Sequence, residues 1–111
     1  MPHKARPVHE VKANMFRVLG HPARVRILEL LREGERSVGA LQAELQLDSG
    51  GTSQHLSALR RIGLVESGRE GTSVFYRVDD ERVFALLDVG REVITRRLVE
   101  QQSLLREFEA G

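Results

Sequence analysis

Apolar residues recur at helical spacing in the first third of the chain and predict two helices there. The first is expected over residues 8–19, with its apolar positions at Val8, Val11, Met15, Val18 and Leu19. Gly20 ends this helix, and Pro22 suits the first turn of a second one, with His21 just before it. The second helix has a broad apolar face and is expected to end before Gly34.

A short third helix and a longer fourth helix are predicted next. Ser37 is a candidate N-cap for the third helix, whose buried stripe is formed by Val38, Leu41 and Leu45. Residues 47–51, Leu-Asp-Ser-Gly-Gly, are typical of a tight turn. The fourth helix is expected from Gly51 or Thr52 to Ile62, and Gly63 is placed to end it. Its apolar positions are Leu56, Leu59 and Ile62.

The last third of the chain predicts a β-hairpin followed by a long helix. Residues 64–67 and 73–78 have strand patterns, and Gly68-Arg69-Glu70-Gly71 between them is expected to form the turn. Residues 80–108 are expected to form one long helix, or two joined near Gly90. The apolar stripe of this segment is typical of a seam for another helix, and it consists of Val83, Leu87, Ile94, Leu98, Leu105 and Phe108.

This order of elements predicts the fold. A short helix, a tight turn, a second helix and then a hairpin form the plan of a winged helix-turn-helix. The predicted class is therefore mainly α with a small β-hairpin, in which four helices precede the hairpin and one follows it. We expect one domain over residues 1–111, with a flexible tail at 1–7 and dimerisation helices at 8–19 and 80–108.

Composition narrows the class of protein. The chain has 111 residues and no Cys, so it fits one domain and has neither disulfides nor thiolate metal sites. No apolar stretch is long enough for a membrane span, and residues 1–6 lack the apolar core of a secretory signal, so a cytoplasmic protein is expected. The net charge is only +1, but residues 1–36 hold eight Lys and Arg against four acids. A nucleic-acid binder stays open, because only its contacting face must be positive.

The polar positions of the predicted fourth helix suit duplex DNA. A helix in the major groove contacts base edges with its N-terminal residues, and Gln54 can pair with adenine through two hydrogen bonds. No acid occurs from Ser49 to Val65, so nothing in this segment repels phosphate. An isolated helix of this kind would be a solvated surface; between a turn and a hairpin it is a candidate DNA-binding helix. The candidate contacts here are Ser49, Thr52, Ser53, Gln54, His55, Ser57, Arg60 and Arg61.

The hairpin carries further candidate DNA contacts. Arginine is favoured where a wing meets the minor groove or the phosphate backbone. Glu70 at the tip would oppose such a contact, so one role of the neighbouring arginine is to neutralise it. The candidates on the hairpin are Arg69, Thr72, Ser73 and Arg77.

Three motifs, taken together, resemble the ArsR family of winged-helix repressors. His21–Leu28, HPARVRIL, resembles the family's second-helix signature, and Ser53–Val65, SQHLSALRRIGLV, is similar to its recognition helix. Gly68–Gly71 and Val74–Val78 are similar to its wing. Each motif alone is modest, but their consistent order from Val8 to Val99 is fairly specific.

The resemblance implies a homodimer that binds a palindromic DNA operator and represses transcription until an effector binds. It also implies that the first and last helices form the dimer interface, which agrees with their apolar stripes. The candidate interface residues are Val8, Val11, Met15, Val83, Leu87, Ile94, Leu98 and Leu105.

The chain departs from the family where many members bind metal. The family's Cys-x-Cys pair corresponds here to Ser37 and Gly39, and residues 80–111 contain no His. Metal sensing is therefore not carried over, and no cofactor is expected. A site built from His3, His9 and a carboxylate of the partner subunit stays an alternative to incidental histidines.

Other hypotheses about the function remain. A small-molecule effector could bind between the first and last helices against Phe16, Phe84 and Val93, although each also suits a plain core position. A partner protein or constitutive repression could replace such an effector. The rival function is a winged helix for protein contacts without affinity for duplex DNA. An enzyme is not expected, because no acid–base pair, nucleophile constellation or phosphate-binding loop is visible.

Overall fold

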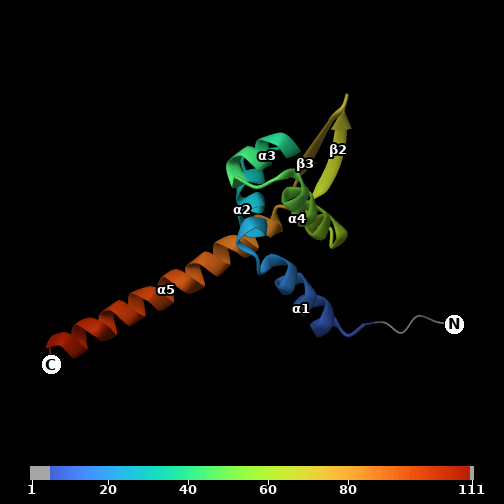
Figure 1. Ribbon diagram of the computed structural model, residues 1–111. Coiled ribbons are helices and arrows are strands. Elements are labelled where there is room, and N and C mark those ends of the chain that lie inside the picture. The colour runs from blue at the N-terminus through green and yellow to red at the C-terminus, as the bar shows by residue number, and fades with distance from the viewer. Residues whose placement is uncertain (1–5, 111) are drawn as a thin grey trace. The chain divides into compact units, whose positions relative to one another are not determined.

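The structure is a computed structural model that describes residues 6–110, and over this range it has five helices and one three-stranded sheet (Figure 1). The chain divides into two units, one ending at Asp80 and the other, which holds α5, beginning at Glu81. The elements are α1 (Val8–Leu19), α2 (Pro22–Leu31), β1 (Arg36–Ser37), α3 (Val38–Leu45), α4 (Ser49–Arg61), β2 (Glu66–Glu70), β3 (Ser73–Arg77) and α5 (Arg82–Ala110).

The first unit has a winged helix-turn-helix architecture. Its core lies among α2, α3, α4 and the residue that precedes the hairpin, because the apolar stripes of these segments face one another. The fully buried apolar side chains are Ile27, Leu28, Leu41, Leu56, Leu59 and Val65. Burying each such side chain stabilises the fold by about 1.5–3 kcal/mol. The core therefore holds α4 by Leu56 and Leu59, as the sequence pattern predicts, and leaves its other face to solvent.

The helix starts follow local capping chemistry. The Ser37 hydroxyl accepts a hydrogen bond from the backbone N–H of Ala40 at 3.1 Å, which confirms Ser37 as the N-cap of α3. The His21 side chain caps α2 in the same way, since its Nδ1 accepts from the N–H of Ala23 at 3.1 Å. Pro22 occupies the first turn of α2, as predicted.

The structure corrects the predicted start of α4. The helix begins at Ser49, so the Gly-Gly pair lies in its first turn and not in a preceding tight turn. The reason is Asp48, whose Oδ1 accepts from the backbone N–H of Gly51 at 2.7 Å. A Cβ at Gly51 would lie 3.0 Å from that oxygen, so glycine allows this close approach.

The hairpin also differs from the prediction. Strand β2 runs over Glu66–Glu70, and its pairs with β3 include Gly68 with Phe75 and Glu70 with Ser73. The predicted four-residue turn is therefore mostly strand, and only Gly71 and Thr72 form the turn. Gly71 has φ of +63°, which glycine adopts freely. The polar sequence suggested a turn, but the cross-strand pairing extends the strands to this glycine.

A short third strand was not predicted. Arg36 and Ser37 pair with Tyr76 and Phe75, so the antiparallel sheet has the order β1-β3-β2. Two residues are too few for a recognisable strand pattern. The hairpin of β2 and β3 is the wing of the fold, and the pairing with β1 joins it to the start of α3.

The second unit contains one uninterrupted helix, α5, which decides between the two predicted alternatives at Gly90. A glycine inside an exposed helix costs about 0.5–1 kcal/mol, which a helix of 29 residues tolerates. Within the described residues, no helix combines the length and apolar character needed to cross a membrane.

Candidate nucleic-acid interface

The polar side of α4 forms an exposed surface opposite its buried stripe. Leu56 and Leu59 are fully buried, so the side of the helix that faces away from them is open to solvent. This surface carries hydroxyl, amide and guanidinium groups and no carboxylate. Its exposed residues are Ser49, Ser53, Gln54, Ser57, Arg60 and Arg61. We call this set the polar face of α4.

The charge of the polar face increases toward the end of the helix. The first turn of α4 contains no acidic residue, and the last turn contains Arg60 and Arg61. Two cations in the last turn also stabilise the helix itself, because they oppose the partial negative charge at its C-terminus. The helix therefore presents neutral hydrogen-bonding groups near its start and two guanidinium groups near its end.

Thr52 lies on the buried side of α4 and not on the polar face. Its exposed fraction is 0%, and its hydroxyl donates to the backbone carbonyl of Asp48 at 3.0 Å. The expected DNA contact is corrected accordingly: a buried hydroxyl that is already hydrogen-bonded has no access to a base or a phosphate. Thr52 instead supports the first turn of α4.

His55 lies on the flank of α4, half-buried beside α2. Its Nδ1 accepts a hydrogen bond from Nε of Arg24 at 3.1 Å. The rings of His55 and His21 lie with their centroids 4.3 Å apart, tilted by 50°. Burial, and then the nearby charges of His21 and Arg24, lower the pKa of His55 from its ordinary value of 6.5. His55 therefore contacts α2 as well as bordering the polar face.

Arg24 is a functional candidate that sequence reasoning missed. Besides its bond to His55, its Nη1 donates to the backbone carbonyl of Val18 at 3.2 Å. One guanidinium thus joins the end of α1, the start of α2 and the side of α4. A signal was present in the sequence: Arg24 lies in the first turn of a helix, where a cation is electrostatically unfavourable. Such a position suggests that the side chain has specific acceptors.

The wing places its candidate residues in two environments. Arg69, Thr72 and Ser73 are exposed, and Glu70 is exposed beside them at the tip. Arg77 is half-buried at the base of the wing, where its Nε donates to Oδ1 of Asp79 at 2.8 Å. The positive charge of the Arg77 guanidinium is therefore partly neutralised by Asp79.

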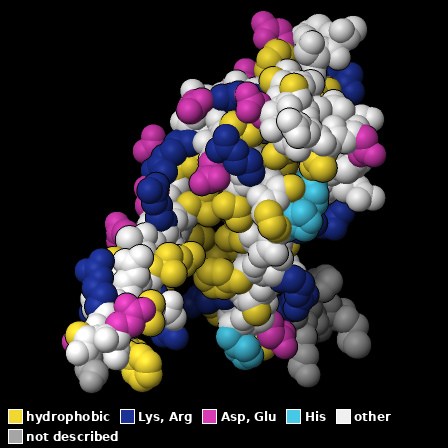
Figure 2. Space-filling model, turned by 60° about the vertical axis from the view of Figure 1, so that its left-hand side comes forward, with side chains coloured by type: hydrophobic (Ala, Val, Ile, Leu, Met, Phe, Trp, Pro, Cys, Tyr) yellow, Lys and Arg dark blue, Asp and Glu magenta, His cyan; other side chains and the backbone are white. Residues whose placement is uncertain are grey.

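The predicted dimer residues are mostly exposed in the single chain. On α1, Val8 and Val11 are exposed and Met15 is half-buried. On α5, Ile94, Leu98 and Leu105 are exposed, while Leu87 is half-buried and Val83 is 8% exposed. Yellow apolar side chains are visible on the surface of the helix that ends at the lower left of Figure 2. Exposed apolar stripes of this kind are typical of surfaces that another chain covers.

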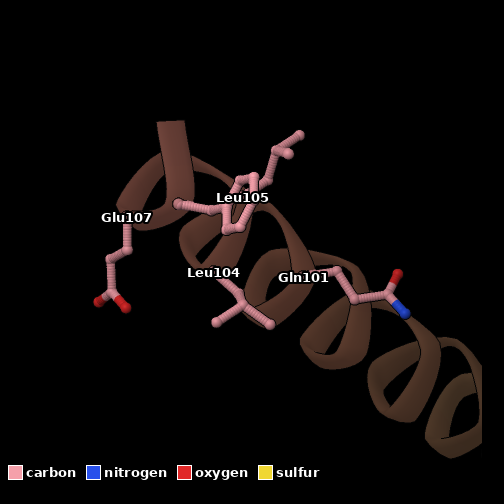
Figure 3. Close-up of a pocket in the computed structure, with 5 residues that line it drawn as sticks. Gln101, Leu104, Leu105 and Glu107 are labelled. Carbon is pink, nitrogen blue, oxygen red and sulfur yellow. The ribbon is translucent and has the colours of Figure 1, made fainter. Parts of the chain in front are cut away.

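A shallow apolar hollow lies near the end of α5. It is lined by Gln101, Leu104, Leu105, Glu107 and Phe108, and Figure 3 shows that these side chains come from a single helix. It is an open surface, and it does not include the residues expected to contact an effector. Of those expected contacts, Phe16 and Val93 are exposed and Phe84 is half-buried.

Metal ligands do not gather within the described range. Among residues 6–110, no three His, Cys, Asp or Glu side chains are arranged to hold a metal ion. His9 is exposed on α1, and His3 lies outside the described residues. Ser37, at one of the two positions of the family's Cys-x-Cys pair, uses its hydroxyl to cap α3.

Comparison with known proteins identifies similar sequences and folds. Residues 21–67 match the sequence profile of the bacterial regulatory proteins of the arsR family. The chain is 40% identical over 109 residues to an uncharacterised HTH-type transcriptional regulator, Rv0081, of Mycobacterium tuberculosis, covering 97% of this chain and 96% of that protein. The crystal structure of Rv0081 superposes with a TM-score of 0.81 at 42% identity, covering 87% of this chain and 98% of that one.

Two further relatives broaden the comparison. The solution structure of Mb0332 from Mycobacterium bovis, described as a homodimeric winged helix-turn-helix DNA-binding domain, superposes with a TM-score of 0.69 at 34% identity. That superposition covers 83% of this chain and 91% of the other. A biofilm growth-associated repressor of Xylella fastidiosa is 34% identical over 92 residues, covering 79% of this chain and 81% of that protein.

Proposed function

The chain belongs to the arsR family of bacterial regulatory proteins, and on this basis we propose that it is a homodimeric transcriptional regulator that binds a duplex DNA operator through α4. Helix α4 is the recognition helix in this proposal. The observation that carries it is the polar face of α4, which is exposed, free of carboxylates and anchored from behind by Leu56 and Leu59. A helix presented in this way can enter the major groove.

The proposed DNA contacts follow from the hydrogen-bonding groups and charges of the exposed side chains. Gln54, exposed near the start of the helix, pairs with the N6 and N7 positions of adenine. The hydroxyl groups of Ser49, Ser53 and Ser57 bind bases or phosphates, and the guanidinium groups near the end of the helix bind phosphates. On the wing, the contacts are assigned to Arg69, Thr72, Ser73 and Arg77. His55, which borders the polar face, stays a candidate for a phosphate or groove contact. Thr52 is left out of this set because it is buried.

A second copy of the chain is proposed to cover the exposed apolar stripes of α1 and α5. A two-fold dimer carries two recognition helices, which then meet two half-sites about 34–36 Å apart, or a multiple of that distance. The operator is therefore expected to be palindromic. The homodimeric neighbour from Mycobacterium bovis supports this assembly.

Repression is the proposed output, supported by the similarity to a biofilm growth-associated repressor. An operator-bound dimer blocks transcription until a signal changes its affinity. The absence of Cys from the sequence excludes a thiolate metal site as that signal. The proposed signal is a small-molecule effector, for which Phe16, Phe84 and Val93 are the candidate contacts.

The experiment that tests this proposal is selection of duplexes from a randomised pool by the full-length protein, followed by binding measurements at several salt concentrations. An enriched palindrome, bound more tightly than a scrambled duplex, supports the proposal. Arg60→Ala is expected to reduce the slope of log affinity against log salt by about one, and the matched variant Arg96→Ala on α5 is expected to leave it unchanged. Failure to bind any duplex at low salt would favour the protein-contact module instead.

A further inference from the structure

We propose that Arg24 and His55 form a positioning pair that holds the recognition helix α4 against α2, and that this pair operates only while His55 is neutral. The inference rests on the proposed function, because it concerns how α4 is aligned for DNA. It adds a residue outside the DNA-contacting surface and a dependence of sequence specificity on pH. Neither residue needs to contact a base for this role.

The donor and acceptor chemistry of the pair is unambiguous. A guanidinium has five N–H donors and no acceptor, so Nδ1 of His55 must accept the 3.1 Å hydrogen bond from Nε of Arg24. A neutral imidazole that accepts at Nδ1 carries its proton on Nε2. An imidazolium ring carries protons on both nitrogens and cannot accept. Protonation of His55 therefore breaks this bond and places two donors against each other.

Burial opposes the protonation of His55, as do a protonated His21 and the guanidinium of Arg24. His21 contributes a ring at 4.3 Å, and that ring is itself held because its Nδ1 caps the N–H of Ala23. Helix α3, which also packs against α4, has one charged residue, Glu44, and this residue is exposed. The charged or titratable residues of α1 are exposed as well, and they are His9, Glu10, Lys12 and Arg17. The pair is therefore formed under neutral conditions.

The pair lies at a place where small movements matter for recognition. His55 follows Gln54 directly in the chain, so a bond that holds His55 also holds the turn that carries the proposed adenine contact. The same guanidinium donates to the carbonyl of Val18, which ties the pair to the end of α1. Loss of the bond lets α4 change its alignment, and the added positive charge attracts any phosphate backbone. Specific binding is therefore expected to weaken relative to non-specific binding.

The test uses the full-length protein and two fluorescent duplexes, one selected by the wild type from a randomised pool and one with the same bases scrambled. The measured quantity is the dissociation constant for the scrambled duplex divided by that for the selected duplex. This ratio is determined at about pH 7.5 and at about pH 5.5. For the wild type, this specificity ratio is expected to fall about tenfold at the lower pH. Arg24→Leu is expected to have the low ratio at both pH values.

Two more variants separate positioning from charge and from folding. In His55→Gln the amide oxygen can accept from Arg24 but does not titrate, so the ratio is expected to vary little with pH. Arg26→Leu is the matched control, because it removes the same charge from the same helix, where Arg26 forms an exposed ion pair with Glu29 at 3.9 Å. This control is expected to follow the wild type. If Arg24→Leu does not fold, the two His55 variants test the proposal. His55→Leu removes the acceptor and is expected to have the low ratio at both pH values, whereas His55→Gln keeps an acceptor and is expected to retain the high ratio.

A readout without DNA completes the test. Long-range ¹H–¹⁵N spectra of the wild type are expected to show the neutral His55 ring with its proton on Nε2. Removing Arg24 is expected to raise the pKa of His55, because one of the positive charges that lowers it is lost. A proton on Nδ1, or a specificity ratio that is independent of pH in the wild type, overturns the inference while leaving the proposed function intact. A wild type that binds no duplex overturns the proposed function and the role of the pair in DNA recognition together.

Discussion

Nε of Arg24 and Nδ1 of His55 lie 3.1 Å apart and are joined by a hydrogen bond across 31 positions of the sequence. The bond connects the start of α2 to the middle of α4, beside the apolar anchors Leu56 and Leu59. Those anchors decide which side of α4 faces the core. The directional hydrogen bond on the flank adds a polar contact between α4 and α2.

The first prediction concerns stability against pH. The folded state lowers the pKa of His55, so the unfolded chain binds more protons near the ordinary value of 6.5. Stability from this group is fully present above that value and is lost as the pH falls from there toward the lowered folded pKa. The midpoint of thermal unfolding is expected to decrease over this window. His55→Gln should flatten the decrease, whereas His9→Gln, an exposed histidine on α1, should not; equal slopes in all three proteins would contradict the prediction.

The second prediction concerns base recognition. Gln54→Ala removes a side chain that is exposed near the start of α4, and it is expected to weaken binding to the selected duplex by about 1–3 kcal/mol. Binding to the scrambled duplex should change little, so base preference at one position of each half-site should relax. Fluorescence anisotropy on duplexes with single base changes measures this. Gln102→Ala, which truncates an exposed glutamine on α5, is the control; an unaffected Gln54→Ala would show that α4 reads DNA without this amide.

The third prediction concerns assembly. Leu98 and Val99 are neighbours on α5 and have the same exposed fraction of 55%, but they differ by about 100° around the helix. Leu98→Asp places a charge in the proposed seam, and dimer formation is expected to be lost because burying an unpaired carboxylate is costly. Val99→Asp should remain dimeric. Light scattering distinguishes the two, and a dimer that survives Leu98→Asp would place the interface elsewhere.

The fourth prediction concerns the wing. The guanidinium of Arg77 forms an ion pair with Asp79 at 2.8 Å. In the proposed complex, this carboxylate would repel a phosphate bound by Arg77. Asp79→Asn frees the guanidinium and removes the repulsion, so DNA affinity at low salt is expected to rise by about twofold to tenfold. The gain should shrink at high salt. Glu29→Gln removes an exposed acid from α2 as the control; a weaker complex with Asp79→Asn would show that the ion pair itself shapes the wing.

Much of the fold could be predicted because its signals are local. The apolar spacing before Gly20 defined the first helix over residues 8–19, and the structure has the same bounds. The hydroxyl of Ser37 acts at the predicted cap. The order of helices and hairpin then led to the winged helix-turn-helix, which the structural neighbours share.

Other features could not be predicted because they depend on contacts between distant segments. Strand β1 exists only because Arg36 and Ser37 pair with β3, and the reach of the wing follows from pairing up to Gly71. The burial of Thr52 was missed because a hydroxyl near a helix start suits either solvent or a carbonyl acceptor.

The helices, the acid-free polar face of α4 and the apolar stripes follow from the order of amino acids, since periodicity, caps and residue types are local properties. The contact between Arg24 and His55 arises in the packed fold, since a hydrogen bond between α2 and α4 depends on how the core packs the two helices together. Hydrophobic burial brings these helices close without specifying polar partners. The partners become fixed only when donors and acceptors must be satisfied in the packed state.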